Sequence, residues 1–206
     1  MGVCYVVGAG ECPNLSINKK NGDYIIAADA GYKYLKDADI EPDAVIGDFD
    51  SLGSIPCGEN VIKLNPVKDI TDMAAAVDIG VEKGYREFHI YGACGGRIDH
   101  TFANIQMIAK LSQQGFKAFI YDGETVITAL CNDYMEFDES YRGFISLFSH
   151  TDECIGVCET GLKYCLDNAV LKNTEPLGVS NEFMGIKSKI AVGNGIAILV
   201  YSQVKF

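Results

Sequence analysis

The feature that most constrains the fold is an alternation of short apolar runs and helical periods over about the first 120 residues. Runs such as 24–28 and 88–91 are short, apolar and bounded by turn residues, which is typical of buried strands. Between such runs, apolar residues recur at helical spacing, as in Met73, Val77 and Val81. Because strands and helices alternate along the chain, we expect an α/β fold with a mostly parallel sheet flanked by helices.

The individual elements follow from the same patterns. We expect strands at 3–7, 24–28, 45–46, 61–64, 88–91 and 117–121, a short helix through Tyr32 and Leu35, and two longer helices ending near Gly84 and Gln114. Asp69 or Thr71 can cap the first long helix. The predicted core faces are Met73, Ala74, Val77, Val81 and Tyr85 for that helix, and Ile98, Phe102, Ile105 and Ala109 for the second.

The pattern changes at about Cys131. Short apolar runs at 144–148, 155–157, 190–192 and 196–200 are separated by turn residues and show no helical period. Asn194-Gly195, between the last two runs, is a strong signal for a two-residue hairpin. We therefore expect two domains, an α/β domain at 1–130 and a small antiparallel β domain at 131–206.

Composition excludes several kinds of protein. The net charge of −11 argues against a broad contact with a nucleic-acid backbone, which needs a basic patch. No run reaches the ~18 apolar residues of a membrane span, and the N-terminus lacks the basic region of a signal peptide. The eight cysteines include no Cys-x-x-Cys pair, so a metal cluster is not indicated. We expect a cytoplasmic protein that binds neither membrane nor nucleic acid.

The glycines after the first predicted strand do not form a known nucleotide motif. Gly8-Ala9-Gly10 continues with Glu11 rather than toward a third glycine, and no P-loop pattern is present. We expect Gly8 and Gly10 to let the chain pass close to a ligand or a neighbouring loop.

Charged residues gather just after the predicted strands or at the helix starts beyond them. These residues are Asp29, Asp48, Asp50, Lys68, Asp72, Arg97 and Asp99. In parallel sheets, ligands bind beyond the carboxyl ends of the strands, so a shared position there favours a functional site.

Asp48 and Asp50 form the sharpest local signal. They follow the apolar pair Val45-Ile46 and are two residues apart, so in extended chain both carboxylates leave the same side. Two carboxylates about 4 Å apart repel each other by roughly 1 to 4 kcal/mol, and Mg²⁺, which prefers oxygen ligands and bridges to phosphates, would offset this. An acidic turn in which Asp50 or Ser51 bonds its own backbone is the equal alternative.

The set as a whole suits one chemistry. This set of strand-end residues combines aspartates with Arg97 and Lys68 around a glycine-rich rim, and the first domain shows no cysteine–histidine pair that indicates a nucleophile. Such groups suit metal-assisted transfer of a phosphoryl group, in which positioning and charge neutralisation do most of the catalysis.

With these residues in view, the sequence resembles the thiamine pyrophosphokinase family. The motifs that carry the resemblance are Asp29-Ala30-Gly31, Gly47-Asp48-Phe49-Asp50-Ser51, Lys68-Asp69-Ile70-Thr71-Asp72, Gly95-Gly96-Arg97-Ile98-Asp99-His100 with Asn104, Gly161-Leu162-Lys163-Tyr164, and Leu177-Gly178-Val179-Ser180-Asn181-Glu182. They run over nearly the whole chain in the family's order.

The resemblance implies a fold and a reaction. The fold is an N-terminal α/β domain with a C-terminal antiparallel β-sandwich, in a homodimer that holds thiamine where the subunits meet. The reaction is Mg²⁺-dependent transfer of the β,γ-pyrophosphoryl group of ATP to the hydroxyl of thiamine, which releases AMP.

The resemblance also assigns residues. It places Mg²⁺ on Asp48, Asp50 and Asp72. It places ATP and its phosphates on Asp29, Lys68, Asp69, Gly95, Gly96 and Arg97, and thiamine on Asp99, Ser180 and Asn181. The catalytic group is Asp72, Arg97 and Asp99. Since an aspartate with a pKa of about 4 is a poor base at pH 7, Asp99 is an orienter first and a proton acceptor second.

Some alternatives stay open. Asp69 is as well explained by a helix cap as by a ligand contact. The chain has no Trp to stack on thiamine, so Phe183 or a tyrosine is the alternative. The competing functions are another Mg²⁺-dependent enzyme acting on a nucleotide or a different alcohol, and a binding protein without turnover.

Overall fold

The computed structural model describes residues 2–47, 60–64 and 70–204. By their contacts the residues group into two compact units, Met1–Met107 with Ile120–Gly123, and Ile108–Phe119 with Glu124–Phe206. Helix α3 (Ile98–Gln113) and strand β6 (Lys117–Asp122) contribute residues to both units.

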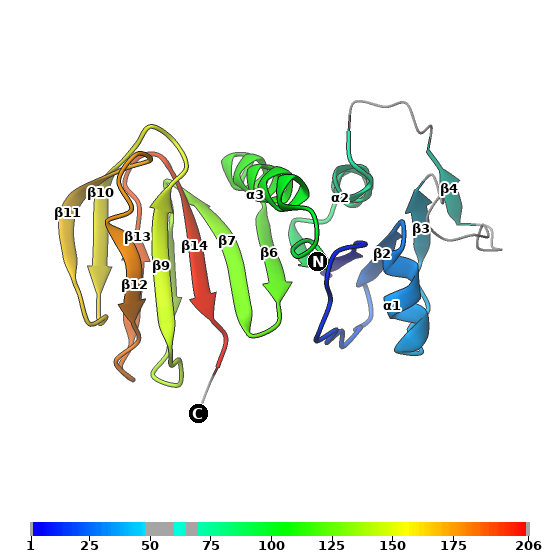
Figure 1. The fold of residues 1–206 in the computed structure, drawn as a ribbon, viewed down its shortest axis with the longest axis horizontal. Helices are drawn as coiled ribbons and strands as arrows, with labels where there is room; N and C mark the ends of the chain where they lie inside the picture. The colour runs from blue at the N-terminus through cyan, green and yellow to red at the C-terminus, as the bar shows by residue number, and fades with distance from the viewer. Residues whose placement is uncertain (1, 48–59, 65–69, 205–206) are drawn as a thin grey trace. The chain divides into compact units, whose positions relative to one another are not determined.

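The first unit is built on a parallel sheet (Figure 1). Its strands are β1 (Cys4–Val7), β2 (Tyr24–Ala28), β3 (Ala44–Gly47), β4 (Val61–Lys63) and β5 (Glu87–Tyr91), in the order β5-β1-β2-β3-β4. All four pairings are parallel, and Val6 in β1 lies opposite Ile26 and Ile90. Every residue of β1 and β3 is buried, as expected where both faces of a sheet are covered. The predicted parallel sheet is confirmed.

Helices α1 (Gly31–Asp37) and α2 (Asp72–Glu82) pack against this sheet. The predicted core face of α2 was only partly right, because Ala74 and Val81 are half-buried while Ala76 and Gly80 are buried. Ala76 and Gly80 have little or no side chain, so α2 can lie close to the sheet on this face. Within the described ranges, no helix has the length and apolar content needed to cross a membrane.

The predicted face of α3 was wrong at its N-terminal end. Ile98 and Phe102 are 69% and 64% exposed, whereas Asn104, Ile108 and Leu111 are buried. The buried stripe includes a polar residue, Asn104, whose amide is hydrogen-bonded. A prediction of the buried face from apolar residues alone therefore chooses the exposed side at the start of α3.

The second unit is an antiparallel β-sandwich. One sheet has the order β12-β9-β14-β7 and the other β11-β10-β13-β8. The strands are β7 (Thr125–Cys131), β8 (Tyr134–Phe137), β9 (Phe144–Ser149), β10 (Glu153–Thr160), β11 (Leu166–Lys172), β12 (Gly178–Glu182), β13 (Ser188–Ala191) and β14 (Ile196–Ser202). Side chains of the two sheets meet inside, as where the rings of Phe137 and Tyr201 lie 5.1 Å apart.

The predicted Asn194-Gly195 hairpin is wrong. Strand β13 pairs with β10 and β8, whereas β14 pairs with β9 and β7, so the chain changes sheets at this turn. Gly195 has φ +117°, and its N–H donates to the Asn132 side chain at 2.8 Å. Asn194 lacks the positive φ of a two-residue hairpin turn and instead forms an isolated bridge with Ile155.

The contact of α2 with the sheet gives the first prediction. A Cβ on Gly80 would lie 2.6 Å from the Phe88 ring and 2.8 Å from Cys4 Sγ, both fully buried. We expect Gly80→Ala to lower the free energy of unfolding by about 1–3 kcal/mol through overpacking, despite the better helix propensity of alanine. Chemical denaturation measures this, with the exposed Glu82→Ala on the same helix as control. A more stable Gly80→Ala variant would contradict the proposed close packing.

Candidate active site

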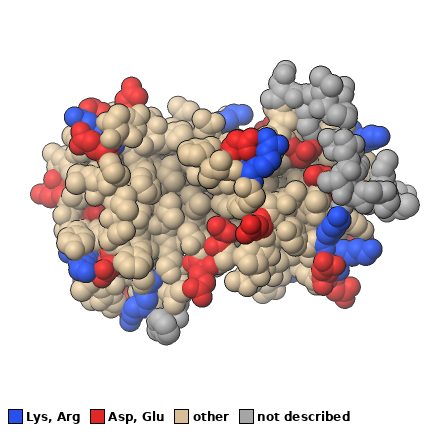
Figure 2. Space-filling view, in the orientation of Figure 1, with Lys and Arg blue, Asp and Glu red and all other residues tan. Residues whose placement is uncertain are grey.

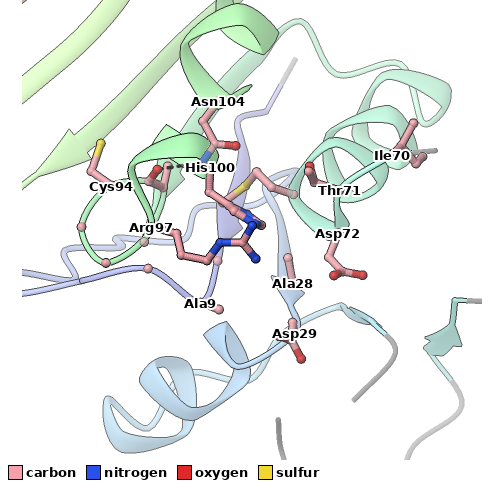
Figure 3. Close-up of a pocket in the computed structure, with 17 residues that line it drawn as sticks. Ala9, Ala28, Asp29, Ile70, Thr71, Asp72, Cys94, Arg97, His100 and Asn104 are labelled. Atoms are coloured by element: carbon pink, nitrogen blue, oxygen red, sulfur yellow. Dashed lines mark hydrogen bonds between the residues drawn. The ribbon is translucent and has the colours of Figure 1, made fainter. Parts of the chain in front are cut away.

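A cavity of about 690 Å³ opens at the carboxyl ends of β1, β2 and β5 in the first unit (Figure 3). Its lining comes from the turns after these strands and from the starts of α2 and α3. The lining residues are Gly8, Ala9, Gly10, Ala28, Asp29, Ile70, Thr71, Asp72, Met73, Gly92, Ala93, Cys94, Gly95, Gly96, Arg97, His100 and Asn104. This is the edge of the sheet where the sequence predicted a site.

The cavity floor depends on two backbones that touch. Gly92 has φ +60°, and a Cβ there would lie 2.4 Å from the Gly8 carbonyl oxygen. The N–H of Gly10 donates to the Gly92 oxygen at 2.9 Å. Only glycine allows both the close approach and the positive φ. The expectation that Gly8 and Gly10 pass close to a neighbouring loop is confirmed.

The loop between β5 and α3 forms the glycine-rich wall. Gly95 and Gly96 have φ +78° and +62°, and both are exposed. Asn104 is buried and anchors the loop, since its Nδ2 donates to the Ala93 oxygen at 2.7 Å. Asn104 belongs to one of the motifs that carry the family resemblance, but the resemblance assigned it no role. The sequence does contain a signal for this role, because Asn104 lies one helical turn before the apolar residue Ile108.

Asp72 is fixed by a helix cap. The Thr71 hydroxyl accepts a hydrogen bond from the Ala74 N–H at 3.1 Å, so Thr71 is the N-cap of α2. The other candidate cap, Asp69, lies outside the described residues. Asp72 therefore occupies the first turn, where the positive end of the helix dipole stabilises a carboxylate. Its side chain lies at the cavity (Figure 3).

Asp29 reaches the cavity from the turn between β2 and α1. It has φ +51°, a conformation that aspartate adopts more readily than most residues. Its N–H donates to the Ile46 oxygen at 2.7 Å, and its own carbonyl accepts from Tyr32 at 3.2 Å. These backbone bonds hold Asp29 at the end of the strand, where it lines the cavity.

Arg97 and Asp99 form a two-bond ion pair at the start of α3. Nε of Arg97 donates to one carboxylate oxygen at 3.1 Å and Nη2 to the other at 2.5 Å. The hydrogen bond from Arg97 lowers the pKa of Asp99, so Asp99 is ionised at neutral pH and is a weak base. Both side chains are mostly exposed, so both are accessible to a ligand.

Cys94, the cysteine among the described lining residues, is not an activated thiol. Burial raises the pKa of Cys94 to about 11, and the charge of Asp122 adds to the effect. Cys94 is therefore a protonated thiol at neutral pH. Among the described residues, the groups that can act on a ligand here include carboxylates, a guanidinium, the His100 imidazole, the Thr71 hydroxyl and backbone N–H groups.

The structure brings most of the described predicted site residues together. Asp29, Asp72, Gly95, Gly96 and Arg97 line one cavity, and Asp99 is paired with Arg97. Asp48, Asp50, Lys68 and Asp69 lie outside the described residues. Among the described residues, the acidic side chains visible in Figure 2 are not gathered in one patch, so their distribution alone does not mark the cavity.

The remaining two predicted residues, Ser180 and Asn181, lie on β12 in the second unit. Ser180 has φ +61°, and its N–H donates to the Ser146 hydroxyl at 3.0 Å. Ser180 is exposed and Asn181 is buried. Nearby, Lys163 is ion-paired with Glu182 at 2.9 Å.

Comparison with known proteins gives matches over both units. Residues 17–120 match the family model "Thiamin pyrophosphokinase, catalytic domain". Residues 134–197 match "Thiamin pyrophosphokinase, vitamin B1 binding domain". A thiamine pyrophosphokinase of Bacillus subtilis is 31% identical over 186 residues, which is 86% of each chain. The chain belongs to the thiamin pyrophosphokinase family.

Solved structures of thiamin pyrophosphokinases have the same fold. The Bacillus subtilis structure superposes with a TM-score of 0.86 at 25% identity, covering 99% of this chain and all of the other. The Geobacillus thermodenitrificans structure gives 0.84 at 27% identity and covers 97% of each chain. The Candida albicans structure, at 16% identity and a TM-score of 0.76, shares the fold, with 97% of this chain and 90% of that chain covered. As a member of the family, the chain is a kinase-type enzyme.

The anchoring of the glycine-rich loop gives the second prediction. Asn104→Ala leaves the buried Ala93 oxygen without its donor, and we expect it to lower the free energy of unfolding by about 1–3 kcal/mol. Gln106→Ala, an exposed change on the same helix, should stay within about 0.5 kcal/mol of the parent. Chemical denaturation compares the two. Equal stability of Asn104→Ala and the parent would show that this bond does not hold the loop.

Proposed function

We propose that this chain transfers the β,γ-pyrophosphoryl group of ATP to the hydroxyl of thiamine, giving thiamine diphosphate and AMP. The observation that carries the proposal is the convergence of Asp29, Asp72 and Arg97 on one cavity at the strand ends. All three residues lie within the segment that matches the family's catalytic domain. ATP-to-thiamine pyrophosphoryl transfer is the known reaction of that family.

The donor set around the cavity suits Mg²⁺. Asp72 lines the cavity with a carboxylate held in the first turn of α2, and hard oxygen donors are the ligands that Mg²⁺ prefers. We assign the ion to Asp72 together with Asp48 and Asp50. When bound, Mg²⁺ would neutralise charge on the transferring phosphates.

The glycine-rich wall and Arg97 bind the polyphosphate in this proposal. Backbone N–H groups of Gly95 and Gly96, just before the start of α3, provide donors for phosphate oxygens. Arg97 offers a planar fork that can grip two phosphate oxygens at once. Lys68, Asp29 and Asp69 complete the nucleotide side of the site.

The Arg97–Asp99 ion pair suggests how substrate binding makes the Asp99 carboxylate available to thiamine. Arg97 donates both bonds to Asp99, and phosphate oxygens can take the same two bonds. Once Arg97 turns to the phosphates, Asp99 is left to accept a hydrogen bond from the thiamine hydroxyl and orient it. The bond from Arg97 lowers the pKa of Asp99 only while the pair is intact. Even at its ordinary value of about 4 an aspartate is a poor base at pH 7, which supports orientation ahead of proton removal.

In this proposal the two domains bind different substrates. Residues 1–130 bind ATP and Mg²⁺, and residues 131–206 bind thiamine at the exposed surface around Ser180. Asn181, the other residue expected to contact thiamine, is buried with its amide bonded within the chain, so we assign it to holding that surface. The enzyme acts in the cytoplasm as a homodimer that holds thiamine where the subunits meet. Exposed apolar side chains on the second unit support the association of two copies, among them Phe144, Leu177 and Val179.

The product separates this reaction from its rivals. With thiamine, ATP and Mg²⁺ we expect equimolar thiamine diphosphate and AMP, detected by chromatography, and no product after the metal is chelated. A protein that releases ADP is a different phosphotransferase, and one that binds thiamine without turnover is a binding protein. Either result would contradict the proposal.

Asp72 gives a sharper test. Asp72→Asn keeps the side-chain shape but removes the charge, and we expect turnover to fall by about 100-fold or more with thermal stability unchanged within a few degrees. Asp78→Asn, an exposed change of the same kind on the same helix, should keep parent turnover. Near-parent activity of Asp72→Asn across a range of Mg²⁺ concentrations would exclude the metal role.

A further inference from the structure

A buried polar bridge crosses the β-sandwich. Asn181 on β12 and Glu159 on β10 are 5% and 3% exposed. Nδ2 of Asn181 donates to a Glu159 carboxylate oxygen at 2.9 Å. Because β12 and β10 belong to different sheets, this bond links the two layers of the sandwich.

The Asn181 amide is fully used inside the chain. Nδ2 also donates to the Tyr164 oxygen at 2.7 Å, and Oδ1 accepts from the N–H groups of Tyr164 and Glu182 at 3.0 and 2.9 Å. An asparagine amide has two N–H donors and an oxygen with two lone pairs. All four positions are filled, so the amide acts by holding its neighbours.

Those neighbours are surface residues of the proposed thiamine side. Tyr164 is 60% exposed and follows Lys163, which is paired with Glu182. Ser180, next to Asn181, is exposed with φ +61°, a conformation that a non-glycine residue keeps only when its surroundings hold it. The amide thus fixes the backbone on both sides of this surface.

Glu159 is the part of the bridge that neither the motifs nor the proposed reaction explain. A carboxyl group in an apolar interior is unfavourable, and burial raises the pKa of Glu159. Apolar side chains of similar volume are often as stabilising as a buried polar pair. What an apolar residue does not supply is a directional acceptor that sets the orientation of the Asn181 amide.

We propose that Glu159 is a positioning residue for thiamine, acting through Asn181 on the backbone of Tyr164 and Glu182, which flank the surface around Ser180. The inference rests on the proposed function, since it takes the surface around Ser180 as the thiamine site. Glu159 itself does not touch the substrate.

The test compares Glu159→Leu, Glu159→Gln and a control variant with the parent by steady-state kinetics. Glu159→Leu keeps the volume but removes the acceptor, and we expect the KM for thiamine to rise about 10-fold, the effect of about 1.4 kcal/mol. The KM for ATP should stay within about 2-fold of the parent, since the cavity in the first unit is untouched. Glu159→Gln keeps an oxygen acceptor and should restore the KM for thiamine to within about 3-fold of the parent.

Ser188→Ala is the matched control. Ser188 is buried on β13, and its hydroxyl has no hydrogen-bond partner among the described residues. Its removal should leave both KM values unchanged. If Glu159→Leu does not fold, Glu159→Asp takes its place, with the acceptor withdrawn by one methylene group and the same selective rise expected.

The outcomes are separable from those of the proposed function. A parent-like KM for thiamine in the Leu or Asp variant, an equal rise in both KM values, or no recovery in the Gln variant would overturn the positioning role. If the parent makes no thiamine diphosphate, the proposed function fails instead. Calorimetric binding of thiamine to the same variants then tests the positioning role directly, with equal affinities for parent and Glu159→Leu overturning it.

Discussion

The contact between the Gly8 and Gly92 backbones is the constraint on which the cavity depends. With a Cβ at Gly92 placed 2.4 Å from the Gly8 oxygen, no larger residue fits without moving the turns after β1 and β5. Those turns form the floor, and the chain continues from the second into the glycine-rich wall and Arg97. The positions of the acids at the neighbouring strand ends follow from the parallel sheet, because its strands all end at the same edge.

Two buried asparagines, one in each unit, have the same structural role. Asn104 ties the glycine-rich loop to α3 through the Ala93 oxygen. Asn181 ties the backbone of Tyr164 to β12. In both places a buried amide satisfies backbone groups of an irregular segment that would otherwise lose their hydrogen bonds. The side chains at the surface of these segments thus depend for their placement on polar groups in the interior.

The sequence predicts the strands of the first unit better than those of the second, where even the largely buried β7 was not expected. Strands β1, β2 and β5 are apolar runs and were expected within one residue or so. Strands β11 and β12 are edge strands with a single buried residue each and carry no clear pattern. Asp29, Asp72 and Arg97 were identified because strand ends share one edge of a parallel sheet. The pairing of Arg97 with Asp99 and the bridge from Asn181 to Glu159 were not, since they depend on side-chain directions and on packing between sheets.

The central claim is that the nucleotide's phosphates and Mg²⁺ meet at the cavity between the glycine-rich loop and Asp72. A crystal structure with thiamine, Mg²⁺ and a non-hydrolysable ATP analogue tests it most directly. We expect the ion at about 2.0–2.1 Å from an Asp72 oxygen, phosphates against Gly95 and Gly96, and Arg97 turned from Asp99 to the phosphates. A nucleotide bound elsewhere, with Arg97 still paired to Asp99, would contradict the account.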